Sequence, residues 1–256
     1  MIRFDYIEAN KEKFRNEFLS AKPFPVIGID DVCDAEKLEK LYDQIPDIET
    51  PSADYVFGKN KFEKSKFREL GGVFEELYQD LISERFATWL KYISNENVFV
   101  DETFYGGGIH QGKTGSFLDM HADFNYHPLH ETWFRNLNIL LYINKGWEKE
   151  HGGELKLEHA ETGVKTEVDV KFNRLAIMLC RGYTLHGYDA IRFPEGKYRT
   201  SIAAYAYTLQ DKPLEDARTT VWHVEKSNPV KYLLSKIWVP AVKIKSKFSK
   251  SKTADH

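Results

Sequence analysis

Three residues in the second half of the chain have the types and spacing to bind a metal ion. His121 and Asp123 are separated by one residue in a run predicted to be a strand, so both side chains point to one face. His186 stands at the end of another predicted strand. Two imidazoles and one carboxylate can occupy one face of an octahedral iron and leave three positions open, as in non-haem Fe(II) oxygenases. We therefore predict that His121, Asp123 and His186 bind Fe(II) and are catalytic.

A basic residue and a hydroxyl follow the last of these three residues. Arg199 lies thirteen residues after His186, and Ser201 shares its face of the next predicted strand. A guanidinium with a neighbouring hydroxyl can bind a carboxylate through charge-assisted hydrogen bonds. The chelating co-substrate 2-oxoglutarate needs such groups at its far end, so the sequence predicts that 2-oxoglutarate binds beside the iron.

Two other pairs of a histidine and an acid compete for the metal-binding role. His159 and Glu161 lie in a segment typical of a turn, and no arginine follows their downstream partner His223. His223 and Glu225 have only the terminal His256 after them. We rank both arrangements below the first one.

Five segments in the second half of the chain occur together in one known family. The stretch 117–208 resembles the prolyl-4-hydroxylase-like branch of the Fe(II)/2-oxoglutarate dioxygenases. The segments are 121-HAD-123, 137-LNILLYINKGW-147, 152-GGELKL-157, 173-NRLAIMLCRGYTLHG-187 and 198-YRTSIAAYAY-207. The resemblance implies a dioxygenase that uses Fe(II), 2-oxoglutarate and O2, hydroxylates an unactivated C–H and releases succinate and CO2.

The resemblance also implies roles for single residues. It places Arg199 on the far carboxylate of 2-oxoglutarate, and Tyr142 matches a tyrosine that hydrogen-bonds this co-substrate in relatives. Leu140 shares the face of Tyr142 and is expected to line the same pocket with Ser201. Halogenating relatives lack the carboxylate ligand, so the presence of Asp123 favours hydroxylation. The candidate substrate contacts are His110, Gln111, Trp133, Arg135 and Asn138.

A second motif suggests a different class of protein. Residues 107–114, GGIHQGKT, satisfy the phosphate-loop pattern G-x-x-x-x-G-K-[ST]. That pattern requires a helix whose N-terminus faces the phosphate, whereas Gly115, Ser116 and an alternating run follow here. A phosphate-loop nucleotide enzyme therefore ranks below the oxygenase, and the glycines fit a loop at the pocket mouth. A catalytically silent barrel that binds metal stays open as a third reading.

The elements that must position these residues change character near residue 97. Helical periodicity is visible in 6–20, after Asp34 and most strongly in 73–93, whereas 47–72 is typical of a long loop. Short β-rich runs separated by turn residues follow, and they favour a jelly roll. These predicted runs are 98–105, 117–124, 137–144, 154–159, 164–170, 174–180 and 199–208, and one further short strand is predicted earlier, within 22–32.

The order of these elements predicts an α+β fold. Its core would be a double-stranded β-helix (a jelly roll, cupin-like), with N-terminal helices packed on one sheet. We expect a helical support region over 1–96, the catalytic core over 97–210 and a C-terminal extension over 211–256, within one structural domain.

Composition supports a globular chain and excludes several classes. The 256 residues are 42% apolar and 14% aromatic, which excludes a disordered chain. Two cysteines are too few for a disulfide framework, and the charged N-terminus is no secretory signal. We therefore expect a cytoplasmic location.

Charge is spread unevenly along the chain. Residues 230–256 carry seven Lys and one Asp, a net +6, which leaves −9 for the remainder of the −3 chain. The acidic body argues against nucleic acid as a partner. Residues 231–256 could lie on an anionic membrane, but a helix packed on the barrel is favoured. For the substrate, a small metabolite or lipid-linked glycan is slightly favoured over a prolyl peptide.

Overall fold

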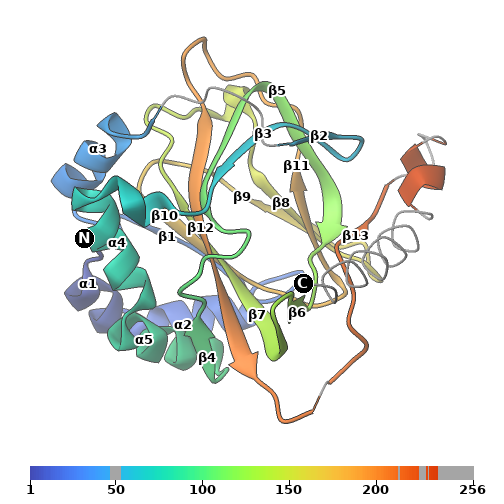
Figure 1. Ribbon diagram of the computed structural model, residues 1–256, viewed down its shortest axis with the longest axis horizontal. Helices are drawn as coiled ribbons and strands as arrows, with labels where there is room; N and C mark the ends of the chain where they lie inside the picture. The colour runs from blue at the N-terminus through green and yellow to red at the C-terminus, as the bar shows by residue number, and fades with distance from the viewer. Residues whose placement is uncertain (47–52, 213, 225–228, 230, 236–256) are drawn as a thin grey trace, which may run out of the picture.

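In the computed structural model, a layer of helices covers one side of a barrel of antiparallel strands (Figure 1). The structure describes residues 1–46, 53–212, 214–224, 229 and 231–235. The predicted fold class, a double-stranded β-helix with N-terminal helices on one sheet, is confirmed.

The helical layer comes from the first hundred residues. Asp34 begins one of its helices as predicted, because its carboxylate accepts a hydrogen bond from the backbone N–H of Lys37. The helical periodicity predicted over 73–93 is confirmed, and the segment divides into two helices because Ser83 adopts an extended backbone and caps the second through the N–H of Phe86. The α-helices are α1 (Phe4–Ala9), α2 (Lys11–Ser20), α3 (Ala35–Asp43), α4 (Gly72–Ile82) and α5 (Glu84–Ser94). Two 3₁₀ turns are η1 (Phe67–Leu70) and η2 (Lys149–His151).

The barrel strands follow the order β1-β10-β7-β12-β5-β11-β8-β9. β5 is the longest strand and belongs to both sides of the barrel: its first half pairs with β12 and its second half with β11. The strands on this path are β1 (Val26–Asp30), β5 (Gly108–Ala122), β7 (His130–Tyr142), β8 (Leu155–His159), β9 (Lys165–Val168), β10 (Arg174–Leu179), β11 (Thr184–Tyr188) and β12 (Arg199–Leu209). The others are β2 (Ala53–Tyr55), β3 (Gly58–Lys64), β4 (Val98–Val100), β6 (Tyr126–His127) and β13 (Val221–Trp222).

Alternation along the strands separates two apolar cores. On β10, Leu175 and Ile177 face the helical layer, whereas Ala176 and Met178 belong to a core inside the barrel. Tyr142 at the end of β7 is fully buried in that inner core. The inner face of the barrel therefore carries the site residues, while the helices stabilise its outer face.

Two expectations for loops are wrong. Residues 47–72 include the hairpin β2–β3, and β3 pairs along β5. The stretch 107–114 is not a loop at the pocket mouth, since it runs into β5 from Gly108. Gly108 has a φ of +95°, and a Cβ there would overlap the Lys64 carbonyl oxygen. This glycine thus serves the close approach of β3 and β5, and no helix begins at Lys113 to bind phosphate.

The C-terminal prediction is only partly covered by the structure. Residues 231–235 are helical, and Lys231 contacts Asp119 of β5. The rest of the proposed membrane-facing tail, 236–256, lies outside the described residues. Among the helices that are described, none is long and apolar enough to cross a bilayer.

Candidate functional site

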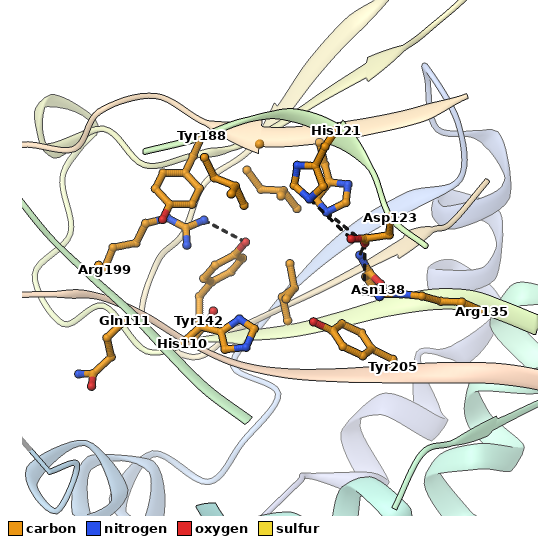
Figure 2. A pocket seen from close by; sticks show the side chains of 17 residues that line it. His110, Gln111, His121, Asp123, Arg135, Asn138, Tyr142, Tyr188, Arg199 and Tyr205 are labelled. Carbon is orange, nitrogen blue, oxygen red and sulfur yellow. Dashed lines mark hydrogen bonds and ion pairs between the residues drawn. The ribbon is translucent and has the colours of Figure 1, made fainter. Parts of the chain in front are cut away.

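The three predicted metal ligands meet at the barrel mouth, where β5 and β11 lie side by side (Figure 2). Their ligand atoms lie within 4.8 Å of one another. His186 Nε2 is 3.3 Å from Asp123 Oδ2, and His121 Nε2 is 3.6 Å from Asp123 Oδ1. His121 and His186 are paired across the two strands, so the β pairing itself brings the imidazoles together. This donor set of two imidazoles and one carboxylate suits Fe(II).

The backbone orients the ring of His121. Its Nδ1 lies 2.9 Å from the carbonyl oxygen of Asp119, which can only accept a hydrogen bond. Nδ1 therefore carries a proton, and Nε2 is the ring nitrogen that faces Asp123. A histidine that binds metal generally has its other nitrogen fixed in this way.

Asp123 is held by two polar side chains of β7. Arg135 Nη2 lies 3.0 Å from Asp123 Oδ2, and Asn138 Nδ2 donates to the same oxygen at 2.8 Å. Arg135 Nε and Nη2 also donate to the Asn138 amide oxygen. Burial by itself would raise the pKa of Asp123, but Arg135 and the two imidazoles outweigh it and hold that pKa well below its usual range. The carboxyl group is thus ionised and ready to bind a cation.

A second group of residues surrounds Arg199, on the other side of the same cavity from His121 and Asp123 (Figure 2). Arg199 Nε donates to the carbonyl oxygen of Gly153 at 2.6 Å, and Nη2 donates to the Tyr142 hydroxyl at 3.3 Å. Burial raises the pKa of Tyr142, so its hydroxyl stays protonated and can donate to an anion. A buried guanidinium beside a phenol is a suitable receptor for a carboxylate.

Two residues that brace Arg199 were not predicted as site residues. The ring of Tyr188 lies 4.1 Å from the guanidinium carbon, and its hydroxyl is 2.9 Å from that of Ser116. Gly153 has a φ of +84°, and a Cβ there would lie 2.9 Å from Arg199 Cδ. Tyr188 could have been found from sequence because it shares a strand face with His186, two residues earlier. The sequence offers no such signal for Gly153, because its contact with Arg199 arises only in the folded chain.

One cavity connects the two groups, and most of the predicted site residues line it. Trp133 does not: it stacks on His130, with ring centroids 3.9 Å apart, in an aromatic cluster with Tyr207. Arg135 and Asn138, predicted as substrate contacts, direct polar atoms to Asp123. Predicted residues on the cavity wall are His110, Gln111, His121, Asp123, Arg135, Asn138, Leu140, Tyr142, His186, Arg199 and Ser201; further ones include Tyr188 and Tyr205.

Residues 107–207 match the family model described as the 2OG-Fe(II) oxygenase superfamily. Over these residues the chain is similar to 2OG-Fe(II) oxygenases. Enzymes of this superfamily require Fe(II), 2-oxoglutarate and O2, and the clustered His121, Asp123 and His186 fit the iron among these. No match was found among curated protein sequences.

Solved structures share the fold of most of this chain. A Pseudomonas putida prolyl-4-hydroxylase has a TM-score of 0.52 and 13% identity, over 79% of this chain and 100% of that one. A Phytophthora capsici prolyl 4-hydroxylase has a TM-score of 0.54 and 15% identity, over 93% and 76%. SnoN, a non-heme alpha-ketoglutarate-dependent epimerase from nogalamycin biosynthesis, has a TM-score of 0.51 and 12% identity, over 85% and 87%. At these identities the likeness concerns the fold alone.

Proposed function

We propose that this protein is a hydroxylase in which His121, Asp123 and His186 bind Fe(II), while Arg199 and Tyr142 bind 2-oxoglutarate. The observation that carries the proposal is that one cavity joins a clustered His-Asp-His donor set to a buried guanidinium paired with a phenol. When bound, Fe(II) would be chelated by 2-oxoglutarate and would supply the activation of O2 for hydroxylation of an unactivated C–H, with release of succinate and CO2.

The chain's own residues would act by binding and orientation. Arg199 and the Tyr142 hydroxyl would hold the far carboxylate of 2-oxoglutarate and so direct its other end toward the three ligands. Arg135 and Asn138 occupy Oδ2 of Asp123, which leaves Oδ1 for the metal. Ser201 and Leu140, on the strands that carry Arg199 and Tyr142, would complete the wall around the co-substrate.

For the substrate we propose a compact molecule, such as a small metabolite or a glycan unit, ahead of a prolyl peptide. Support comes from the segment after β12, which is tied to residues beside the three metal ligands. The Asn125 side chain hydrogen-bonds Glu215, Asp216 and Arg218 of this segment, and the segment then pairs with β5 beside His121. A segment fixed beside the ligands leaves less room for an extended peptide than an open groove does.

Anaerobic binding of 2-oxoglutarate to the Fe(II)-loaded protein tests the site. We expect a metal-to-ligand charge-transfer band in the wild type, its loss in His186→Ala, and a higher 2-oxoglutarate requirement in Arg199→Ala. A folded, iron-loaded wild type without the band would overturn the proposal. With candidate substrates, succinate release coupled to a product heavier by one oxygen atom would establish hydroxylation, whereas a product of unchanged mass would exclude it for that substrate.

A further inference from the structure

The ring of His121 lies in a row of three side chains across neighbouring strands. His186 of β11 is its pairing partner on one side, and Trp222 of β13 is its partner on the other. Ring centroids are 4.2 Å apart for His121 and His186, and 4.8 Å apart for His121 and Trp222. Directly paired residues on adjacent strands are close enough to restrict each other's rotamers.

A second aromatic ring fixes Trp222 in turn. Phe57, between β2 and β3, stacks on the indole with a centroid separation of 4.9 Å and an interplanar angle of 14°. Phe57 is fully buried, and Trp222 is 8% exposed. The indole is therefore packed between His121 and a ring that is itself immobilised in the core.

Asp119 links the same segments to His121. Its backbone N–H donates to the Phe57 carbonyl oxygen at 2.8 Å, and its own carbonyl oxygen accepts from His121 Nδ1. Its carboxylate accepts from Lys231 Nζ at 2.9 Å. Hence the β2–β3 hairpin and the C-terminal segment meet at the residue that orients His121.

Both aromatic residues lie outside the segment that matches the oxygenase family. The match covers 107–207, whereas Phe57 precedes it and Trp222 follows it. Asn125 and Tyr126 anchor the connection between β12 and β13, since the Tyr126 hydroxyl accepts from the Leu214 N–H. The contacts on His121 are thus additions made by the rest of this chain.

We propose that Trp222 is a positioning residue for His121, and that the segment after β12 is therefore part of the iron site. This inference rests on the proposed role of His121 as an iron ligand. The Asp119 carbonyl fixes the tautomer of the imidazole, while the indole restrains the ring plane and shields that side of the site from water. A chain that ended after β12 would keep all three ligands but would hold one of them loosely.

Metal affinity of matched tryptophan variants tests this inference. The variants are Trp222→Leu, Trp222→Phe and, as control, Trp89→Phe, which alters another buried indole stacked on a phenylalanine, in the helical layer. We expect Trp222→Leu to weaken Co(II) binding about tenfold, within the range seen when residues behind a metal ligand are changed. Trp222→Phe should recover most of the affinity, and Trp89→Phe should bind Co(II) as the wild type does.

Tryptophan fluorescence provides a second measurement, one that would not change if Trp222 only stabilised the fold. Co(II) should quench Trp222 because the indole lies against a ligand, so Trp222→Phe should lose a large part of the quenching that Trp89→Phe retains. Wild-type Co(II) affinity in folded Trp222→Leu, or equal quenching in the two Phe variants, would overturn the inference. If Trp222→Leu does not fold, Trp222→Phe and Phe57→Leu carry the test.

The outcome also separates this inference from the proposed function. If the wild type and His121→Ala both fail to bind Co(II) or Fe(II), the iron site itself is wrong. If the wild type binds metal, His121→Ala does not, and Trp222→Leu binds normally, only the role of Trp222 is wrong.

Discussion

Arg135 Nη2 lies 3.0 Å from Asp123 Oδ2, in a position where the arginine side chain is only 2% exposed. The guanidinium is also packed against the Tyr205 ring, 3.5 Å from its centroid. Among the groups that lower the pKa of this buried carboxylate, Arg135 is the one with a permanent positive charge. Arg135 therefore compensates the charge of Asp123 in the metal-free protein and fixes which oxygen is available.

Arg135→Leu should destabilise the metal-free protein by about 3–5 kcal/mol, because it leaves a buried carboxylate without its charged partner. Chemical unfolding measures this difference. Arg135→Lys should be more stable than Arg135→Leu but should bind Fe(II) roughly tenfold more weakly than the wild type. A lysine ammonium cannot contact Asn138 and Asp123 together as the planar guanidinium does. Arg85→Leu, at an exposed pair with Glu8, should change stability far less and serves as control. Equal losses at the two arginines would contradict this role.

Gly153→Ala should raise the KM for 2-oxoglutarate about tenfold, as expected for weakening one hydrogen bond to a charged group. The new methyl group would lie 2.9 Å from Arg199 Cδ and from Ile191 Cγ2 and would displace the guanidinium. Gly163→Ala is a matched control, because Gly163 also has a positive φ, +67°, but no atom within 4 Å of the added Cβ. Steady-state kinetics should show a change in KM for the first variant alone.

Tyr142→Phe removes the hydroxyl that accepts from Arg199 Nη2. We expect roughly a fivefold higher KM for 2-oxoglutarate, corresponding to about 1 kcal/mol for one hydrogen bond, with a smaller effect on kcat. Isothermal titration of the anaerobic protein should show the same loss in affinity. A large fall in kcat with unchanged KM would show that the hydroxyl acts on the reacting centre instead.

The pair of Asp30 and Arg174 should make stability depend on pH in acid. Arg174 donates to both carboxylate oxygens across β1 and β10, and this lowers the pKa of Asp30 below 3.8. The contribution is present above the unfolded-state pKa and is lost as pH falls through the lower folded-state pKa. Because the Asp30 side chain is 51% exposed, the contribution is below about 1 kcal/mol. Melting curves of wild type and Asp30→Asn should differ near pH 6 and converge near pH 2; a constant gap would contradict the assignment.

Lys113→Ala should leave the rate of 2-oxoglutarate turnover unchanged. It should also leave nucleotide binding the same as in the wild type. Lys113 is exposed on β5, next to the Phe62 ring, with no helix N-terminus behind it. Thermal shift with ATP and magnesium, before and after the substitution, checks this. Stabilisation by ATP that depends on Lys113 would restore the nucleotide-enzyme reading.

The sequence was sufficient to predict the clustered His-Asp-His donor set, because the positions of these side chains follow from alternation along single strands. Side-chain alternation places His121 and Asp123 on one face, and a turn-bounded strand carries His186 beside them. The same alternation pointed to the wall formed by Tyr142 and Leu140.

Other parts depend on contacts between distant segments, and sequence patterns do not report those. Residues 58–64, GKNKFEK, lack apolar alternation and are typical of a loop. They form β3 because they pair with β5 in the folded chain. The surroundings of His121 combine Phe57 and Trp222, which come from opposite ends of the chain. The sequence predicts Arg135 as a substrate contact, because residue spacing does not show that its guanidinium is paired with the Asp123 carboxylate.

The order of strands places β9 at one end of the sheet, with a backbone edge that no other strand of the described residues covers. An uncovered edge is a template on which strands of other molecules can assemble into aggregates. β9 has only four residues, and Lys165 and Glu167 project charges that pair with Glu158 and Lys149 of neighbouring segments. A short, charged edge opposes such assembly, so it helps this chain to stay dispersed at high concentration, and replacing Lys165 and Glu167 by valine would remove that protection.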